Sequence, residues 1–532
     1  MARLTNSCLI SARCTILNLI KQFFGKKNKT KETQKTEHSQ PSATLNPSQK
    51  TKVRTAPSLE KKTTKPRKTP IHSAQTVTRS VTNKSAAKFR LKASEYGIYP
   101  RMIHRNALSV VERLQRNGYE AYIVGGCLRD LLLEQKPKDF DVATNANPDQ
   151  IKKVFQRQCR LIGRRFRLAH IMFGRDVIEV ATFRGEHQEE HQGDASRQNE
   201  DGMLLRDNVY GSLEDDAQRR DFSVNALYYD PKNNILIDYF NGVEDLRNGK
   251  LRLIGDAETR YQEDPVRMLR AIRFMAKLDM FLERDSEAPI QNCAVLLKNI
   301  PTARLFDESL KLLQNGYGLK TYELLKQYDL LQYLLPNLNI LFTEKQDSLA
   351  EKMIRTALQS TDERIKDNLR VNPAFLFAAV YWYPLREKMD QLKNEADLNN
   401  FDAFSIAASE VLEDLCRALS VPKRHTMVVR DIWQLQLQLP KRSGNRAEKI
   451  MAQPKFRAGY DLLAMRAELE GGELIELTKW WHEYQLSNPQ QREHLMVEQD
   501  ERHPPPQAKK RRRYRRRKTT TKNSAKNTTQ NS

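Results

Sequence analysis

The chain has 532 residues, of which 39% are hydrophobic, and a formal net charge of +24. This length allows several domains, and the low hydrophobic fraction indicates unstructured segments beside them. Six cysteines are scattered without a C-x-x-C pair, which excludes a disulfide-rich scaffold and predicts reduced thiols in a cytoplasmic protein.

Basic residues are concentrated near the two ends of the chain. Residues 26–92 contain 18 basic and 3 acidic side chains, and residues 509–532 contain 11 basic and no acidic ones. Large apolar side chains are rare in both segments, so we predict disordered basic regions over 1–95 and 488–532. The apolar stretch near the start is too short and too charged to span a membrane. A near-neutral body between basic arms suits binding to a polyanion.

The folded part is expected to begin near Tyr96. A helix that ends near Gly118 is predicted next, before the first distinctive motif. The apolar run 121–124 predicts a buried strand, and a helical pattern follows from residue 127. Between them, Gly125 and Gly126 let backbone N–H groups approach an anion closely. The sequence therefore predicts a phosphate-binding turn.

Two carboxylates follow this turn on a predicted strand. Asp139 and Asp141 alternate with apolar residues in the sequence KDFDV, so both should project from one face of the strand. Neighbouring carboxylates repel each other and favour a divalent cation between them. A phosphate-binding turn beside a metal-binding pair meets the requirements of a nucleotidyl-transfer site.

A β-hairpin is predicted over 167–183, with its turn at residues 174–176. Its return strand carries Glu179 and should lie beside the strand of Asp141, which makes Glu179 a candidate third carboxylate. The alternative for Glu179 is an ion pair on the face of the strand with one of three arginines: Arg164, Arg165 or Arg167.

The motif RRDF places Arg220 and Asp221 before Asn225 and a second predicted hairpin over 228–242. Taken alone, Arg220 and Asp221 are interpreted as an ion pair that caps a helix. Their distance from the diglycine motif fits a single domain of about 150 residues.

A third motif, EDPVR, begins a predicted helix within residues 252–278. Pro265 suits the first turn of this helix and Asp264 suits its cap. Asp264, Arg267 and Arg270 follow one another at intervals of three, on one face, and Arg273 continues the series. Arginine donors beside a carboxylate acceptor can read the edge of a nucleobase. An exposed, salt-bridged helix is the alternative.

The sequence between about 285 and 485 is helical in pattern, and a run of nine basic residues with Tyr514 follows at 509–518. Tyr514 is suited to stacking on a base. We predict a catalytic head over 96–250, a helical neck over 251–340 that binds nucleotide and RNA, and a helical RNA-binding body over 341–487.

Taken together, the segments YIVGGCLRDLLLEQKPKDFDVAT, GRRFRLAHIMFG, RRDF and EDPVRMLRAIRFMAKL resemble the bacterial poly(A) polymerases. These enzymes belong to a class of nucleotidyltransferases that also contains the CCA-adding enzymes. The resemblance covers about residues 96–518. It implies an α+β fold in which a polymerase beta-like nucleotidyltransferase head, with a small mixed sheet and helices, precedes an all-helical neck and body.

The resemblance also implies an activity. This is the template-independent addition of adenylate from ATP to single-stranded RNA 3′ ends, with Mg²⁺ or alternatively Mn²⁺, by two-metal catalysis. Such addition would mark mRNA and other transcripts for decay in the cytoplasm, with RNA-decay proteins as candidate partners through the basic tails.

Residue roles follow by the same resemblance. Asp139 and Asp141 would hold the metal ions, and Asp221 would complete the catalytic set, with Glu179 as its alternative. The expected nucleotide-binding residues are Gly125, Gly126, Arg129 and Arg220 at the triphosphate, Asp264 and Arg267 at the adenine, and Asn225, Arg270 and Arg273 beside them. A CCA-adding tRNA nucleotidyltransferase is the nearest alternative function. A non-catalytic RNA-binding scaffold is the more distant one.

Overall fold

The computed structural model describes residues 90–163, 167–185, 196–198, 204–207, 209–335, 338, 348–443 and 445–502. Residues 1–89, the two arginines at 164 and 165 and the basic run 509–518 therefore lie outside the described residues. In the part of the chain that the structure describes, no helix is both long enough and apolar enough to cross a membrane.

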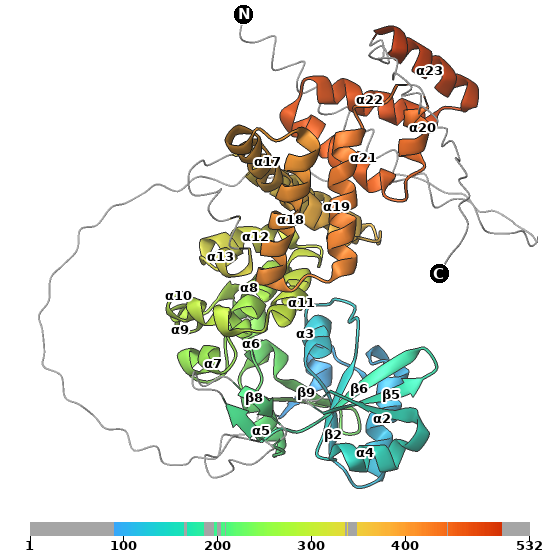
Figure 1. Ribbon diagram of the computed structural model, residues 1–532. Helices are drawn as coiled ribbons and strands as arrows, with labels where there is room; N and C mark the ends of the chain where they lie inside the picture. Colours follow the sequence, from blue (N-terminus) through green and yellow to red (C-terminus); the bar gives the residue numbers. More distant parts are fainter. Residues whose placement is uncertain are drawn as a thin grey trace, which may run out of the picture. The chain divides into compact units, whose positions relative to one another are not determined.

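A mixed sheet of eight strands forms the head (Figure 1). The strand order is β1-β10-β9-β2-β3-β6-β5-β4, and β3–β6 is its single parallel pair among the described strands. The strands are β1 (Arg90–Lys92), β2 (Ala121–Val124), β3 (Asp141–Thr144), β4 (Cys159–Ile162), β5 (Leu168–Phe173), β6 (Asp176–Thr182), β9 (Leu227–Asp230) and β10 (Ile235–Asp238). A separate antiparallel pair consists of β7 (Ser196–Gln198) and β8 (Leu204–Asp207).

Both predicted hairpins are present, β5–β6 and β9–β10. Side chains alternate across each strand, so Ile123, Val142 and Val180 share one face of the sheet. The helices α2 (Arg105–Arg116) and α4 (Pro148–Phe155) pack on that face. The alternate residues, among them Val124 and Asp141, therefore belong to the opposite face.

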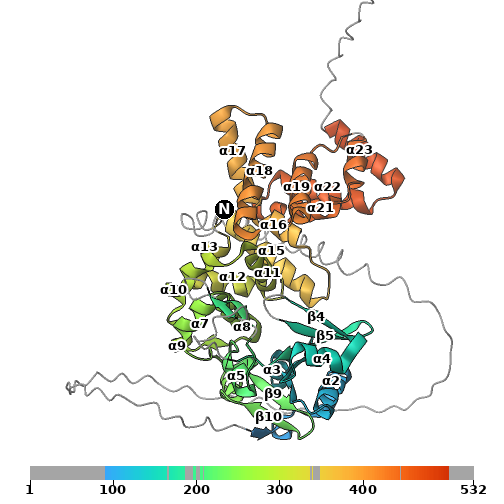
Figure 2. The ribbon, with the colours of Figure 1, turned by 60° about the horizontal axis from the view of Figure 1, so that its bottom comes forward.

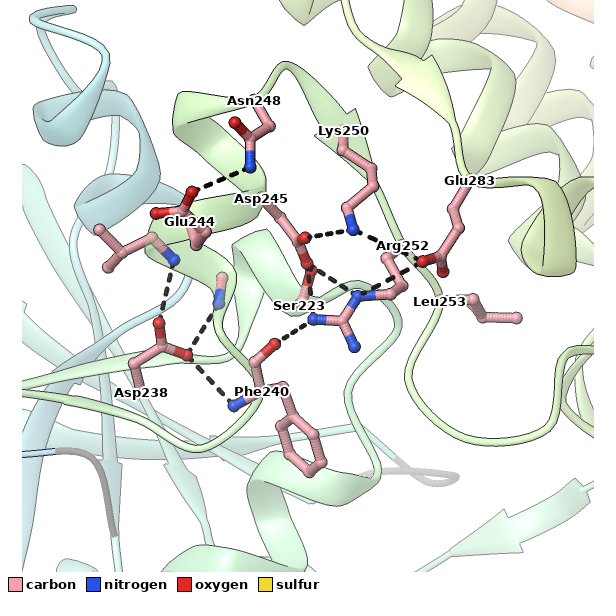
Figure 3. Close-up of polar contacts among 12 residues, drawn as sticks. Ser223, Asp238, Phe240, Glu244, Asp245, Asn248, Lys250, Arg252, Leu253 and Glu283 are labelled. Carbon is pink, nitrogen blue, oxygen red and sulfur yellow. Dashed lines mark hydrogen bonds and ion pairs between the residues drawn. The ribbon is translucent and has the colours of Figure 1, made fainter. Parts of the chain in front are cut away.

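Figure 3 shows a polar junction where the head sheet meets the following helices. Asp245 of α6 (Gly242–Arg247) is 2% exposed and accepts hydrogen bonds from Ser223 Oγ (2.6 Å) and from Arg252 Nε (2.9 Å) and Nη2 (2.7 Å). Lys250 lies 3.1 Å from Asp245 and 3.5 Å from Glu283. Asp245 of α6, Lys250 and Glu283 are therefore held together, although Glu283 lies more than 30 residues after Lys250 in the chain.

The same junction contains a short parallel pair, β11 (Lys250–Leu251) and β12 (Phe281–Leu282). Between these strands the chain forms α7 (Ala257–Glu263) and α8 (Val266–Leu278). Both ends of the segment that carries the EDPVR motif are therefore fixed at one place.

The described residues after β12 are mostly helical (Figures 1 and 2). The helices are α9 (Arg284–Glu287), α10 (Ile290–Cys293), α11 (Thr302–Leu313), α12 (Gly318–Gln327), α13 (Leu331–Leu334), α15 (Leu349–Lys366), α16 (Pro373–Val380), α17 (Trp382–Ala396), α18 (Asn400–Leu419), α19 (Lys423–Gln438), α20 (Arg446–Met451), α21 (Phe456–Glu470), α22 (Glu473–Leu486) and α23 (Pro489–Arg502). The predicted class, a mixed-sheet head followed by helices, is confirmed.

Two ends of the folded region differ from the expected ones. Arg90 of β1 pairs with Ile237 of β10, so the head sheet begins before residue 96. At the other end, α23 lies within the segment predicted to be a disordered tail. Leu495 and Met496 explain the difference, because they pack against an apolar cluster that contains Trp481. The boundaries between head, neck and body remain predictions.

Candidate active site

The diglycine turn directly follows β2 and begins α3 (Gly126–Leu132). Gly125 has a φ of 83°, a left-handed conformation that glycine adopts without strain. A Cβ atom at Gly125 would lie 3.5 Å from the guanidinium of Arg220. The turn therefore brings bare backbone next to a cation, an environment that suits a phosphate.

Arg129 lies beneath this turn and is 5% exposed. Its Nε donates to Asp130 Oδ1 (2.8 Å), its Nη1 donates to Asn225 Oδ1 (2.6 Å), and its guanidinium lies 5.2 Å from the centre of the Phe274 ring. Arg273 also packs on Phe274, with 4.9 Å between its guanidinium and the ring centre. Neither Arg129 nor Arg273 lines the pocket that contains Arg220 and Asp221, although both were predicted to bind nucleotide.

The two carboxylates that were predicted to bind metal lie at the start of β3. Asp141 is the first residue of that strand, whereas Asp139 precedes it in irregular backbone, and both carboxylates are exposed. The strand was expected to include Asp139. It begins later because the partner strand β2 ends at Val124, which pairs with Asp141.

Glu179 is the nearest strand neighbour of this pair. The parallel register pairs Val142 with Val180, so Asp141 and Glu179 are adjacent on the same face. Desolvation by the surrounding protein, the Glu179 carboxylate and the Asp139 carboxylate raise the pKa of Asp141 to about 6, although Arg220 opposes them. Glu179 also lies 3.5 Å from His170 Nε2, whereas the alternative pairing with Arg164 or Arg165 falls outside the described residues.

Asp221 has a different environment. Its Oδ2 accepts from Arg270 Nε (2.8 Å) and Nη2, and its Oδ1 accepts from Asn225 Nδ2 (3.1 Å) and Phe222 N (2.8 Å). Burial alone would raise the pKa of Asp221, but the Arg270 guanidinium outweighs burial and holds that pKa well below its usual range. Asp221 and Glu179 thus occupy distinct positions in one pocket.

Arg220 is fixed by two groups of the head. Its Nε donates to the Tyr228 hydroxyl (2.8 Å), and its Nη2 donates to Asp216 Oδ2 (3.0 Å). The Tyr228 hydroxyl also donates to Asp216 Oδ2 (2.6 Å). The guanidinium is therefore held beside Gly125 by a buried network that needs no ligand.

The EDPVR motif forms a second wall of the pocket. Asp264 ends α7 and accepts two hydrogen bonds from Arg304 of α11, from Nη1 (2.8 Å) and Nη2 (2.7 Å). Pro265 takes the N-cap position of α8 that was expected for Asp264, whose Oδ1 accepts from Val266 N at 3.3 Å. Arg267 lies close by, where its Nη1 donates to Glu263 Oε2 (2.8 Å).

These groups line one open cavity of about 390 Å³. Its polar lining residues are Asp141, Glu179, Arg184, Asp216, Arg219, Arg220, Asp221, Asp264, Arg267, Arg270, Arg304 and Glu308. Arg304 and Glu308 were not among the predicted site residues. The available signal was that Arg304 and Glu308 lie four residues apart in the amphipathic helix TARLFDESLKLL, whose other charged residues are Asp307 and Lys311.

The donor set fits a magnesium ion. Among the described residues, no group of three or more His, Cys, Asp or Glu side chains is arranged to hold a metal by itself. Mg²⁺ is commonly bound by one or two carboxylates, with water and substrate phosphate completing its shell. Asp139 and Asp141 supply such a partial set, and the adjacent Glu179 carboxylate adds negative charge that a cation would neutralise.

The chain is 68% identical to poly(A) polymerase I of Haemophilus influenzae over 409 residues, which cover 77% of this chain and 90% of that protein. It belongs to the poly(A) polymerase I family. The Salmonella typhimurium poly(A) polymerase I is 53% identical over 76% of this chain and 88% of its own. The chain is therefore a nucleotidyltransferase that polyadenylates RNA without a template.

Family models agree with this assignment along the chain. A poly(A) polymerase head domain matches 121–252, a probable RNA- and SrmB-binding site of polymerase A matches 279–341, and a polymerase A arginine-rich C-terminus matches 396–518. A solved Thermotoga maritima CCA-adding enzyme complexed with tRNA shares the fold, with a TM-score of 0.50 and 19% identity over 75% of this chain and 88% of that one.

Proposed function

We propose that this poly(A) polymerase binds ATP across the pocket, with the triphosphate at Gly125, Gly126 and Arg220 and the adenine near Asp264 and Arg267. One observation carries this proposal: the pocket is lined both by cationic groups beside the diglycine turn and by the carboxylate–arginine wall of the EDPVR motif. A triphosphate requires the first set and a nucleobase edge requires the second.

Asp139 and Asp141 would hold Mg²⁺, or alternatively Mn²⁺, at the end of the pocket nearest β3. A bound divalent ion would lower the pKa of an attacking hydroxyl and neutralise the leaving pyrophosphate. The RNA 3′ oxygen then bonds to the α-phosphorus, and the bond between that phosphorus and the pyrophosphate oxygen breaks. The hydroxyl proton leaves to a pocket carboxylate or to water.

Asp221 stays the predicted third functional carboxylate, and the contacts support separate roles for it and Glu179. The adjacency of Glu179 to Asp141 supports a place beside the metal ion. The double contact with Arg270 supports a role for Asp221 in holding that arginine toward the nucleotide. Loss of either carboxylate would then reduce activity for different reasons.

The substrates would be single-stranded 3′ ends of mRNA and other transcripts, which the added tail marks for decay in the cytoplasm. The basic segments at the two chain ends supply charge for RNA or for RNA-decay proteins.

Purified protein with Mg²⁺, incubated with an oligoadenylate primer and separately with a tRNA that lacks its CCA end, tests the proposal. Each nucleotide is offered alone. We expect long extension of oligoadenylate with ATP and little use of CTP. Addition of CTP and ATP to the tRNA, with oligoadenylate left unextended, would contradict it.

A further inference from the structure

A buried arginine connects the two walls of the pocket. Arg260 of α7 is 9% exposed, and its Nη2 donates to the backbone carbonyl oxygens of Arg219 (2.7 Å) and Arg220 (2.8 Å). These carbonyls belong to the RRDF segment, whose Arg220 side chain stands beside the diglycine turn. Arg260 therefore binds the wall that faces the triphosphate.

The same guanidinium also orders the wall that faces the base. Arg260 Nη1 donates to Glu263 Oε2 (2.7 Å), and that oxygen also accepts from Arg267 Nη1 (2.8 Å). Arg267 Nη1 donates in addition to the backbone carbonyl of Arg260 (2.5 Å). Arg267 is thus held through both the side chain and the backbone of Arg260.

Burying the Arg260 guanidinium costs free energy of folding. Burial and the neighbouring cations, chiefly Arg267, lower the pKa of Arg260 to about 10, and only Glu263 and a more distant carboxylate oppose them. Its Nε is buried and has no hydrogen-bond partner among the described residues. Well-packed apolar side chains often replace buried ion pairs without loss of stability. The forked donors of arginine are suited instead to fixing several acceptors in one geometry.

We propose that Arg260 is a positioning residue for nucleotide selection, because it sets the distance between Arg267 at the base and Arg220 at the triphosphate. This inference rests on the proposed placement of ATP. Lysine at position 260 would keep the charge but could not bond to both carbonyls and to Glu263 with one planar fork. The base-reading and phosphate-binding groups would then no longer be held together.

The test is Arg260→Lys in the full chain, with steady-state kinetics on oligoadenylate. We expect the KM for ATP to rise by about tenfold or more while kcat changes by less than about threefold, the pattern of lost substrate binding. The ratio of kcat/KM for ATP to that for CTP should fall by about tenfold. Titration with ATP in the absence of RNA should show the same loss of affinity.

Arg466→Lys is the matched control. Arg466 of α21 is 6% exposed and makes forked contacts with Glu470 (2.9 Å) and Gln436 (3.1 Å), but it does not line the pocket. It should lower thermal stability while leaving the ATP KM and the ATP-to-CTP ratio within about twofold of the wild type. A loss of stability alone therefore cannot imitate the expected result.

Glu263→Gln supplies a second route if the lysine variant does not fold, because it removes the carboxylate shared by Arg260 and Arg267. It too should raise the ATP KM more than it changes kcat. Variants that fold and keep the wild-type ATP KM and nucleotide ratio would overturn the positioning role. A wild-type enzyme that fails to extend oligoadenylate would instead contradict the proposed function itself.

Discussion

At the residue scale, the candidate site contains two kinds of carboxylate. Some are exposed at the start of β3, and others are paired with arginine. Asp139 and Asp141 are exposed and Asp141 is adjacent to Glu179, whereas Asp221 is bonded to Arg270. Carboxylates placed together without a cation are suited to binding one. The two groups should therefore respond differently to substitution.

We predict that Asp139→Ala or Asp141→Ala abolishes nucleotide addition and leaves folding and RNA binding nearly intact. Both side chains are exposed, so their removal creates no cavity. Activity should fall below about a hundredth of the wild-type kcat, because metal assistance is lost. Single-turnover rates measure this, and circular dichroism and RNA filter binding serve as controls. A variant that retains a larger rate would remove its residue from the proposed role.

Asp221→Asn should lower both stability and ATP affinity. The substitution removes the carboxylate that is hydrogen-bonded to Arg270 in a partly buried site, which we expect to cost on the order of 3 kcal/mol. Because the folded-state pKa of Asp221 is depressed, its contribution to stability is present above its unfolded pKa of about 4 and is lost as pH falls below that value. The difference in Tm between wild type and variant should therefore shrink from pH 7 to pH 3. A constant difference would contradict the depressed pKa.

At the element scale, the strands and helices that carry the motifs were predictable from the sequence. Most of the contacts between these elements were not. Period-two alternation located the β5–β6 hairpin, and the diglycine located the turn after β2. The burial of Arg129 could not be predicted, because it depends on Asn225 and Phe274, which are about 100 and 145 residues away. Arg304 was missed for the same reason, since its partner Asp264 lies 40 residues away in sequence, between α7 and α8.

Close backbone packing at α6 leads to a prediction of its own. A Cβ atom at Gly242 would lie 2.3 Å from the carbonyl oxygen of Ser223, a backbone atom that cannot move without its whole segment. Ser223 begins the short 3-10 helix that contains Asn225. Gly242→Ala should therefore destabilise the head by about 1–3 kcal/mol, the usual range for overpacking, and lower activity. Thermal unfolding measures the effect. An unchanged Tm would show that the segment adjusts freely.

At the scale of the whole molecule, a near-neutral catalytic region is joined to basic segments that carry most of the net charge. The order of head and helical regions was predictable from hydrophobic periodicity. The end of the folded region was not, because α23 has little apolar character and is attached through Leu495 and Met496 to a cluster formed by other helices.

Deletion of the chain after Ala508 should weaken RNA binding without changing the chemical step. The deleted run 509–518 carries nine basic residues, and each phosphate neutralised on a single strand contributes about −0.7 to the slope of log K against log salt. If about half of these charges engage, the slope should flatten by roughly three units. The rate at saturating RNA should stay constant and products should shorten. An unchanged salt slope and product length would assign the run to a protein partner or an anionic surface.

The parallel pairing of β11 with β12 makes the intervening segment an exchangeable cassette. Its two ends are adjacent strands, with Phe281 N bonded to Gly249 O (3.0 Å) and Glu283 N bonded to Leu251 O (2.9 Å). A protein engineer could therefore transplant residues 252–280 between relatives with different nucleotide preferences and preserve the attachment points. The transplanted segment would carry Arg260, Asp264 and Arg267 together. In the recipient protein, its Asp264 and Arg270 would have to form the contacts with the residues equivalent to Arg304 and Asp221.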